Sequence, residues 1–239
     1  MRIFRRLRQA PTARKTWEAS QKYELEHAIG FMESPSFRSH HRDLMAGRLN
    51  VSAGHRDELM LKESFGGSPE DFERFLTHIP GRACVDIGPC VASQIAGWDV
   101  ARVRYAIEPL LDPIVDWQKA NLGGSAYEGM VGFARPAEKL VGELVGKIDG
   151  AIVCRNMLDH TPHWPFVLSN IASYAAPGCK LLLWTDIDHR GTDDEGHYDI
   201  TSDASAFKRL VEQLGFRVVR EHSSADRQEL NWGCFAERI

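Results

Sequence analysis

Two acidic residues and a glycine turn are placed where a ribose-containing ligand would bind. Asp86 lies in a short apolar run and is followed by Gly88, Pro89 and Cys90, a composition typical of a tight turn. A turn that leads from a strand into a helix lets backbone N–H groups approach a ligand closely. Glu108 ends the next apolar run, 22 positions after Asp86. An acid at about this spacing can accept hydrogen bonds from both ribose hydroxyls, with a solvated loop acid as the alternative.

Three histidines near the fourth and fifth apolar runs are candidates for proton transfer. His160 follows the fourth run, His189 follows the fifth, and His197 lies in the loop beyond it. Ligands of open α/β sheets bind at the carboxyl ends of the strands, and an imidazole exchanges protons near neutral pH. We expect His160 to be the general base and His197 to be its main competitor. The alternative for each is a surface or capping histidine.

Acidic residues also gather after the fifth run. They are Asp186, Asp188, Asp193, Asp194 and Glu195. Oxygen clusters suit hard divalent cations, but acidic loops are usually just solvated, and we expect no metal ion. Asp159 is expected to cap the helix that follows it.

Apolar runs and helical segments alternate along most of the chain. Strands are predicted at residues 83–87, 103–107, 129–133, 148–154, 180–184, 216–220 and 232–236. Helical or loop segments separate the first five, for example at residues 112–121, 136–145 and 163–174. Right-handed crossovers then predict a Rossmann-like, doubly wound α/β fold with seven mostly parallel strands. The last two runs are too close for an intervening helix and are predicted to pair antiparallel.

The region before this alternation has a different character. Residues 1–15 are basic, and amphipathic helices are predicted at residues 16–33 and 36–49. A further helix is predicted to start at Ser68. We divide the chain into residues 1–67, a basic tail with a helical lid over the ligand pocket, and residues 68–239, the α/β domain. The tail is expected to be solubilising, with weak contact to an anionic membrane surface as the alternative.

Composition argues against several classes of protein. Hydrophobic residues make up 43% of the chain and charged residues 26%, as in soluble globular proteins. The net charge of −4 gives no general case for nucleic-acid binding. Five cysteines without a C-x-x-C pair indicate reduced core cysteines and a cytoplasmic location. No apolar run reaches the ~20 residues needed to span a bilayer.

Three further motifs make the pattern specific. They are CRNMLDH at residues 154–160, the turn Ala176-Pro177-Gly178 before a strand, and Leu214-Gly215-Phe216 before another. In their order and spacing, residues 70–239 resemble the class I S-adenosylmethionine-dependent methyltransferases. The resemblance is closest to the branch found beside glycan and natural-product biosynthesis enzymes. It implies S-adenosyl-L-methionine as the cofactor.

The resemblance assigns roles to the glycine turn and to the acid after the second strand. Asp86 and Gly88, together with Pro89 and Cys90, would hold the methionine end of the cofactor and the loop. Glu108 would bind the ribose.

The remaining roles fall on the loops after the second, third and fourth strands. By the same resemblance, Pro109 and Leu110 line the adenine edge. Ala137 and Glu138 would meet the adenine amino group, and Asn156 would face the methyl-donor end of the pocket.

The glycine loop departs from the family pattern. Where the family has D-x-G-x-G-x-G, this chain has Cys90 and Ala92 in place of the second and third glycines. Both residues are small enough for a ligand to approach. Any left-handed backbone at these positions would be strained, because a Cβ disfavours it.

The sequence therefore predicts an O-methyltransferase that acts on a sugar hydroxyl of a glycan or glycosylated metabolite. Two alternatives stay open. One is a nicotinamide-dependent Rossmann oxidoreductase, although the chain has no Tyr-x-x-x-Lys pair. The other is a non-catalytic protein that keeps the methyltransferase fold, which the altered glycine loop favours. The acceptor, a small molecule or a glycan, and the oligomeric state are left open.

Overall fold

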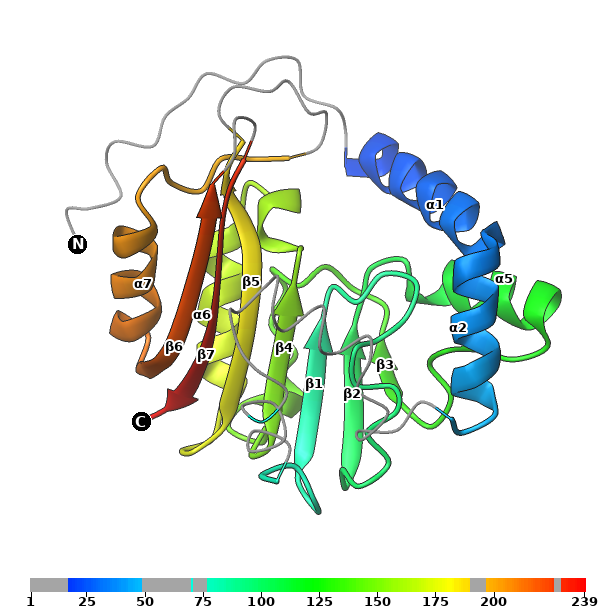
Figure 1. Ribbon diagram of the computed structural model, residues 1–239, viewed down its shortest axis with the longest axis horizontal. Helices are drawn as coiled ribbons and strands as arrows, with labels where there is room; N and C mark the ends of the chain where they lie inside the picture. Colours follow the sequence, from blue (N-terminus) through cyan, green and yellow to red (C-terminus); the bar gives the residue numbers. More distant parts are fainter. Residues whose placement is uncertain (1–16, 49–69, 71–76, 190–196, 226–228) are drawn as a thin grey trace.

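The computed structural model describes residues 17–48, 70, 77–189, 197–225 and 229–239. Its strands form a seven-stranded sheet in the order β3-β2-β1-β4-β5-β7-β6 (Figure 1). They are β1 (Ala83–Ile87), β2 (Val103–Ile107), β3 (Val131–Phe133), β4 (Ala151–Arg155), β5 (Lys180–Asp188), β6 (Phe216–Ala225) and β7 (Leu230–Arg238). Neighbours from β3 to β5 pair in parallel, whereas β7 pairs antiparallel with β5 and β6. The predicted fold class is confirmed.

Alternate side chains of the central strands pack into two different hydrophobic cores, one on each face of the sheet. The helices are α1 (Trp17–Glu33), α2 (Pro35–Met45), α5 (Leu111–Leu122), α6 (Trp164–Tyr174) and α7 (Ala204–Gln213), with short 3-10 turns η2 (Gly142–Leu144) and η3 (Leu158–His160). Val85 and Ile152 pack with residues of α6 and α7. Cys84 and Val153 point the other way and pack with Ile95. This two-residue period is what a strand buried on both faces requires.

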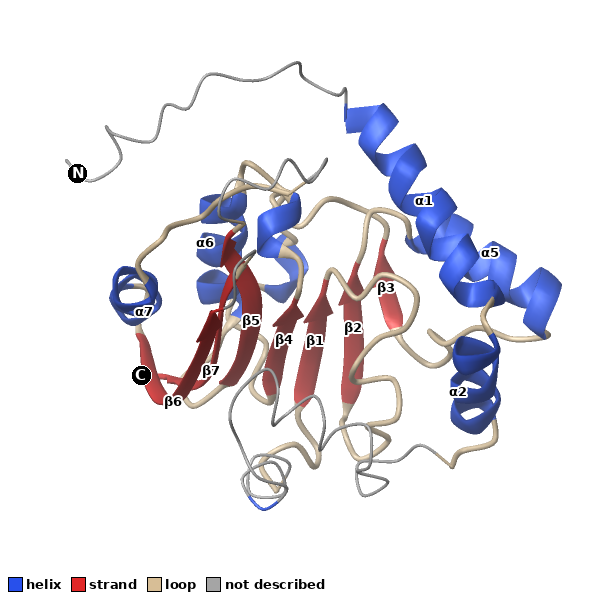
Figure 2. Cartoon of the chain, turned by 45° about the horizontal axis from the view of Figure 1, so that its top comes forward, coloured by secondary structure: helices blue, strands red, loops and turns tan. Residues whose placement is uncertain are grey.

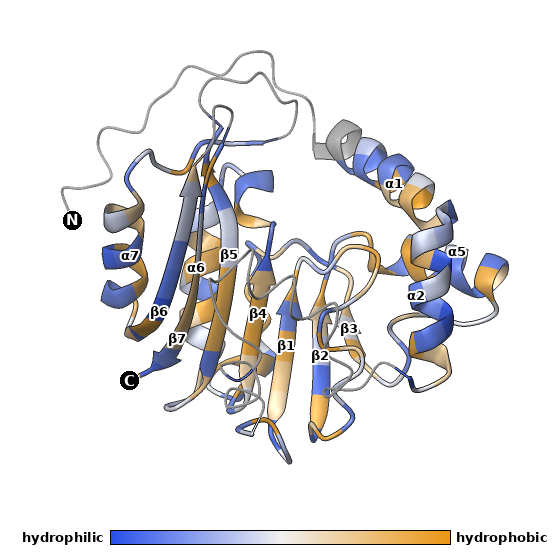
Figure 3. Ribbon diagram, in the orientation of Figure 1, coloured by the Kyte–Doolittle hydropathy of each residue, from blue (hydrophilic) through white to orange (hydrophobic). Residues whose placement is uncertain are grey.

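The centre of the sheet is buried and apolar, whereas its β6 edge is exposed and largely polar. Every residue of β1 is buried, whereas most of β6 is exposed. In Figure 3 the central strand β4 is mostly orange, whereas β6 is blue in its middle part and pale toward its end. Charged residues on an edge strand oppose pairing with another chain.

The segment after β1 differs from the prediction, because it forms turns and bends instead of a helix. The Asp86 carboxylate accepts hydrogen bonds from the Ser93 hydroxyl at 2.7 Å and from the backbone N–H of Gln94 at 2.6 Å. The Ser93 hydroxyl accepts one from the N–H of Ile95 at 3.2 Å. Side chains that bind nearby backbone groups in this way compete with helical hydrogen bonds.

Residues 136–145, predicted as a helical or loop segment, form a loop with the short turn η2. The carbonyl of Ala137 accepts from Asn170 Nδ2 at 2.8 Å, and the N–H of Val141 donates to the Tyr174 hydroxyl at 2.9 Å. These backbone groups are therefore bound to side chains of α6. The last three strands are longer than predicted, because antiparallel pairing of β7 continues through polar positions to the ends of β5 and β6.

Both N-terminal helices lie near α5, and α1 lies toward the end of the sheet where the parallel strands finish (Figures 1 and 2). Both predicted helices form, and α2 ends earlier than expected, at Met45. Met32 of α1 packs with Phe37 of α2 and Ile114 of α5. Within the described residues, no helix is long and apolar enough to cross a membrane. The basic tail and the start of the predicted helix at Ser68 lie outside the described residues.

Candidate functional site

The turn after β1 closes against the end of β4. Gly88 has a φ of 69°, and a Cβ added to it would lie 2.2 Å from Cγ of Met157. Only glycine fits this position without moving Met157. Cys90 has a φ of 54°. The left-handed backbone that favours glycine is therefore present at the position where this chain has replaced the family's glycine.

Glu108 ties this turn to the end of β2. Its Oε2 accepts a hydrogen bond from the N–H of Cys90 at 3.0 Å, and its Oε1 accepts one from the N–H of Leu110 at 2.9 Å. The side chain is 5% exposed, and burial raises the pKa of its carboxyl group. The structure thus brings Glu108 and Cys90 into contact, and their predicted roles in cofactor binding stay predictions. It also shows that Glu108 is not a solvated loop acid.

The buried carboxylate of Asp86 stabilises the turn segment after β1 through hydrogen bonds. Asp86 is 1% exposed, and burial raises the pKa of its carboxyl group to about 6. Its hydrogen bonds to Ser93 and Gln94 are those that shape the turn segment. Pro89 and Pro109 lie half-buried in the turns after β1 and β2.

The other predicted contact residues lie further along the same edge of the sheet. Glu138 accepts a hydrogen bond from the Thr161 hydroxyl, and the carbonyl of Ala137 is bound to α6. Asn156 is exposed, has a φ of 51°, and donates its N–H to the Trp184 carbonyl at 2.8 Å. Asparagine is among the residues that tolerate this conformation best. Glu138 and Ala137 therefore each have a structural partner, whereas Asn156 marks the exposed end of β4.

Asp159 does not cap α6, contrary to the prediction. It lies in η3, and the residue at the N-cap of α6 is His163, which makes no side-chain cap hydrogen bond. Asp159 is 0% exposed, and its Oδ1 accepts a hydrogen bond from the Thr185 hydroxyl at 2.9 Å. Its backbone carbonyl accepts one from Tyr198 at 2.7 Å. These contacts point the side chain toward the end of β5 and the loop beyond.

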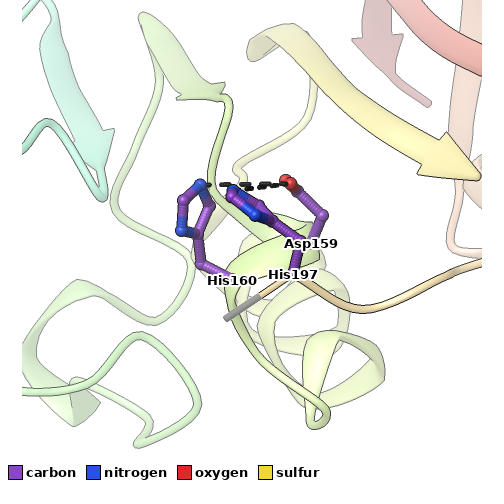
Figure 4. Close-up of side chains that lie close together, drawn as sticks. All are labelled: Asp159, His160 and His197. Atoms are coloured by element: carbon purple, nitrogen blue, oxygen red, sulfur yellow. Dashed lines mark ion pairs between the residues drawn. The ribbon is translucent and has the colours of Figure 1, made fainter. Parts of the chain in front are cut away.

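Three histidines surround the other oxygen of Asp159, and we call Asp159, His160, His189 and His197 the histidine cluster. The distance from Oδ2 of Asp159 to Nε2 is 3.9 Å for His160, 3.4 Å for His189 and 3.8 Å for His197. The ring centroids of His160 and His197 are 4.4 Å apart. Figure 4 shows the imidazoles of His160 and His197 directed toward this carboxylate.

The pKa values of the histidine cluster are coupled. Burial acts to raise the pKa of Asp159, but the His189 imidazole and the charge on His160 outweigh it, so the pKa is lowered. Burial acts to lower the pKa of His160, but the carboxylates of Glu24 and Asp159 outweigh it and the pKa is raised. Asp159 also raises the pKa of His189. A buried carboxylate is thus kept ionised by the imidazoles around it.

Glu24 extends the cluster to the N-terminal region. Its Oε1 lies 3.5 Å from Nδ1 of His160. Neither this contact nor the pairing of Asp159 with His189 was predicted from the sequence. The contact between Asp159 and His189 could have been inferred from the expected pairing of the fourth and fifth strands, because neighbouring parallel strands bring the residues after them to the same edge of the sheet.

The acidic loop forms no metal-ligating group within the described residues. Asp186 is buried, and burial raises the pKa of its carboxyl group to about 6. Asp193, Asp194 and Glu195 lie outside the described residues. The group of described residues that could hold a metal ion is instead Asp159, His160 and His197, whose ligand atoms lie within 4.8 Å of one another.

Comparison with known proteins identifies the fold. No protein-family model matches the sequence, and no curated protein matches it significantly. Among solved structures, the 4+2 cyclase SpnF matches with a TM-score of 0.59 and 13% identity, over 95% of this chain and 97% of that one. Magnesium protoporphyrin IX methyltransferase from Synechocystis PCC 6803, with bound S-adenosylmethionine, matches with a TM-score of 0.51 and 16% identity, over 96% and 100%.

A third structure is a phosphoethanolamine N-methyltransferase from Haemonchus contortus, in complex with phosphomonomethylethanolamine and S-adenosylhomocysteine. It matches with a TM-score of 0.51 and 14% identity, over 73% of this chain and 53% of that one. The fold of the chain is that of the class I S-adenosylmethionine-dependent methyltransferases. At these identities the likeness concerns the fold alone, and SpnF is named for a different reaction.

Proposed function

We propose that the protein is an S-adenosylmethionine-dependent methyltransferase. The observation that carries the proposal is Glu108, a buried carboxylate at the tip of β2 that faces the turn formed by Gly88 and Cys90. In doubly wound sheets this is the place where a carboxylate binds the hydroxyls of a ribose. The methyltransferase fold supports the same cofactor.

The carboxylate has the capacity that ribose binding needs. Each oxygen of Glu108 accepts one backbone N–H, and an ionised carboxylate has about four acceptor sites in total. Two hydroxyl donors can therefore be accommodated without losing the bonds that hold the loops. Asp86, Gly88, Pro89 and Cys90 would hold the methionine end, and Pro109 and Leu110 the adenine edge.

The strand order argues against the nicotinamide alternative. The classic dinucleotide-binding sheet has the order 3-2-1-4-5-6 with parallel strands. Here the antiparallel strand β7 lies between β5 and β6. A methyltransferase is therefore favoured over a nicotinamide-dependent oxidoreductase.

We further propose that the acceptor is a hydroxyl, and that it is a sugar hydroxyl of a glycan or glycosylated metabolite. Bound S-adenosylmethionine would supply an electrophilic methyl group, so the protein must mainly hold the acceptor in line with it. A hydroxyl must also lose its proton. The histidine cluster follows β4 and β5, and β4 lies next to β1 in the sheet. Its imidazoles and carboxylates also suit hydrogen bonds to an acceptor with several hydroxyls.

Calorimetry with the purified full chain tests the cofactor. S-adenosylhomocysteine and S-adenosylmethionine should bind with one-to-one stoichiometry, and NAD should not bind. Binding of NAD without either sulfur ligand would overturn the proposal. Binding of none of them would favour a non-catalytic protein that keeps the fold.

Methyl transfer to a panel of sugars and glycosides tests the acceptor. His160→Ala should lower turnover by about 10²–10⁴-fold. A larger loss of turnover in His197→Ala than in His160→Ala would identify His197 as the more important of the two histidines. His163→Ala is the matched control, because His163 is an exposed histidine outside the cluster. Equal turnover in all three variants and the wild type would show that the cluster takes no part in the reaction.

A further inference from the structure

The histidine cluster contains a buried acceptor that its neighbours leave incomplete. Within the described residues, Oδ2 of Asp159 has no hydrogen-bond partner, although Asp159 is 0% exposed. The nearest nitrogens of His160, His189 and His197 lie within ion-pair distance of Oδ2, at 3.9, 3.4 and 3.8 Å, but none makes a hydrogen bond with it. The imidazoles can balance the charge of the carboxylate, yet this oxygen lacks the hydrogen bond that a buried acceptor normally has.

The ligand atoms of this group lie somewhat further apart than atoms that share a metal ion, and small shifts would bring them to that spacing. Zinc bonds of about 2.0 Å in a tetrahedron place neighbouring ligand atoms about 3.3 Å apart. The ligand atoms of Asp159, His160 and His197 all lie within 4.8 Å of one another. Shifts of the two partly exposed imidazoles, with side chains 29% and 24% exposed, can close the remaining difference.

We infer that the histidine cluster binds a divalent transition-metal ion of the zinc type through Asp159, His160 and His197. Two imidazoles and one carboxylate form a ligand set that suits zinc and its first-row neighbours, whereas magnesium and calcium prefer oxygen ligands. The site lies at the end of β4 and not in the acidic loop after β5. Ion binding there does not require the proposed methyl transfer.

The surroundings of the three ligands resemble the outer contacts of metal sites. Oδ1 of Asp159 is held by the Thr185 hydroxyl, which leaves Oδ2 for the ion. Glu24 lies 3.5 Å from Nδ1 of His160, the nitrogen that does not face Asp159. A carboxylate behind a ligating histidine fixes its ring and raises its basicity. His189 is placed to orient Asp159 from the buried side, with Nε2 at 3.4 Å from Oδ2.

Three protein ligands leave a coordination position open. A hydroxyl bound there would lose its proton to solvent water more readily, because the ion would lower its pKa. If the proposed function is correct, His160 and His197 then act on the acceptor through the ion and not as free imidazoles. Their loss would lower turnover in either case, so metal binding has to be measured directly.

The experiment is a titration of the metal-stripped full chain with Zn²⁺, followed by calorimetry. The wild type should bind one ion. His160→Ala and His197→Ala should each weaken the affinity at least 100-fold, and the positioning variants His189→Ala and Glu24→Gln about 10–100-fold. His163→Ala should bind as the wild type does. Co²⁺ should give a visible absorption band that His160→Ala and His197→Ala lose.

Failure of the wild type to bind Zn²⁺ overturns the inference, and so does unchanged affinity in both ligand variants. Circular dichroism of each variant checks that it has folded. A titration of the same metal-stripped samples with S-adenosylhomocysteine tests the proposed cofactor separately. Binding of S-adenosylhomocysteine without binding of Zn²⁺ would support the methyltransferase proposal and overturn the metal site. Binding of Zn²⁺ without binding of S-adenosylhomocysteine would support the metal site and overturn the methyltransferase proposal.

Discussion

Two neighbouring regions at the carboxyl ends of the parallel strands are built in different ways. In the glycine-turn region, formed by Asp86, Gly88, Cys90 and Glu108, both buried carboxylates accept hydrogen bonds from backbone or hydroxyl donors. In the histidine cluster, the side chains lie close together, yet Oδ2 of Asp159 has no hydrogen-bond partner among the described residues. The first region is internally complete before a ligand arrives. The second leaves one buried carboxylate oxygen without a hydrogen bond, and the proposed metal ion would bind there.

The strongest test of the glycine-turn region is Gly88→Val. The new side chain would collide with Met157 and occupy a backbone with φ of 69°, so binding of S-adenosylhomocysteine should be abolished while the sheet still forms. The collision with Met157 adds a cause that the sequence did not reveal. Calorimetry measures the affinity, and circular dichroism measures the fold.

Gly123→Val is the matched control. Gly123 has a φ of 79° but nothing within 4 Å of an added Cβ. It should lose stability through strain and retain ligand binding. Normal binding by Gly88→Val would show that the turn does not cradle the ligand.

Replacing Glu108 should have the next largest effect. Glu108→Ala should weaken S-adenosylhomocysteine binding by about 1.5–3 kcal/mol, the loss expected for hydrogen bonds to a charged group. Because Glu108 also binds the N–H groups of Cys90 and Leu110, we expect a lower melting temperature as well. A residue at a solvated strand tip would show no such loss of stability.

Asp116→Ala provides the comparison, because Asp116 is an exposed acid on α5. It should change neither the affinity nor the melting temperature appreciably. If folded Glu108→Ala bound the ligand as tightly as Asp116→Ala, the assignment of Glu108 to the ribose would be wrong.

The pH dependence of the unfolding free energy tests the burial of the Asp86 carboxyl group. Burial raises its folded-state pKa from an ordinary value of 3.8 to about 6, so the folded protein binds a proton more tightly than the unfolded chain does. The resulting stabilisation is full below pH 3.8 and is lost as the pH rises through about 6. Relative to Asp86→Asn, the wild type should lose about 1 kcal/mol of unfolding free energy between pH 5 and pH 7.

Urea unfolding of both proteins across this range gives the difference directly. The substitution keeps the shape of the side chain and removes its titration. Parallel pH profiles of the two proteins would mean that the carboxyl group of Asp86 is solvated or otherwise compensated.

The smallest effect is expected at Cys90. Cys90→Gly removes a Cβ from a backbone with φ of 54°. Strain relief, offset by the greater freedom of glycine in the unfolded chain, should stabilise the protein by about 0.5–1 kcal/mol. Thermal unfolding measures the change. Ala92→Gly lacks the positive φ and should be destabilising, so a similar gain in both variants would contradict strain at Cys90.

In the glycine-turn region the sequence predicted where Asp86 and Glu108 lie relative to the strands, and their role in cofactor binding stays a prediction. Asp86 and Glu108 each stand at the end of a short apolar run, and parallel strands bring such ends together. The turn segment after β1 was mispredicted as helix, since the sequence does not show that Asp86 and Ser93 bind its backbone.

The histidine cluster could be predicted only in part. The sequence indicates His160 and His197 as individual bases, but it predicts a helix cap at their common neighbour Asp159. That contact depends on the short η3 turn, which aims Asp159 at Thr185, 26 residues later in the chain. Side-chain direction within an irregular turn has no periodic signal in the sequence.

The position of β7 has a consequence for how the chain is made. β7 is the last of the seven strands in sequence, yet it lies between β5 and β6. Until residues 230–238 have left the ribosome, the backbone groups along that side of β5 lack their final partner. A growing chain with such an open edge is prone to pair with other chains. We therefore expect chains that lack β7 to be more prone to aggregation than chains in which β5 and β6 are joined by it.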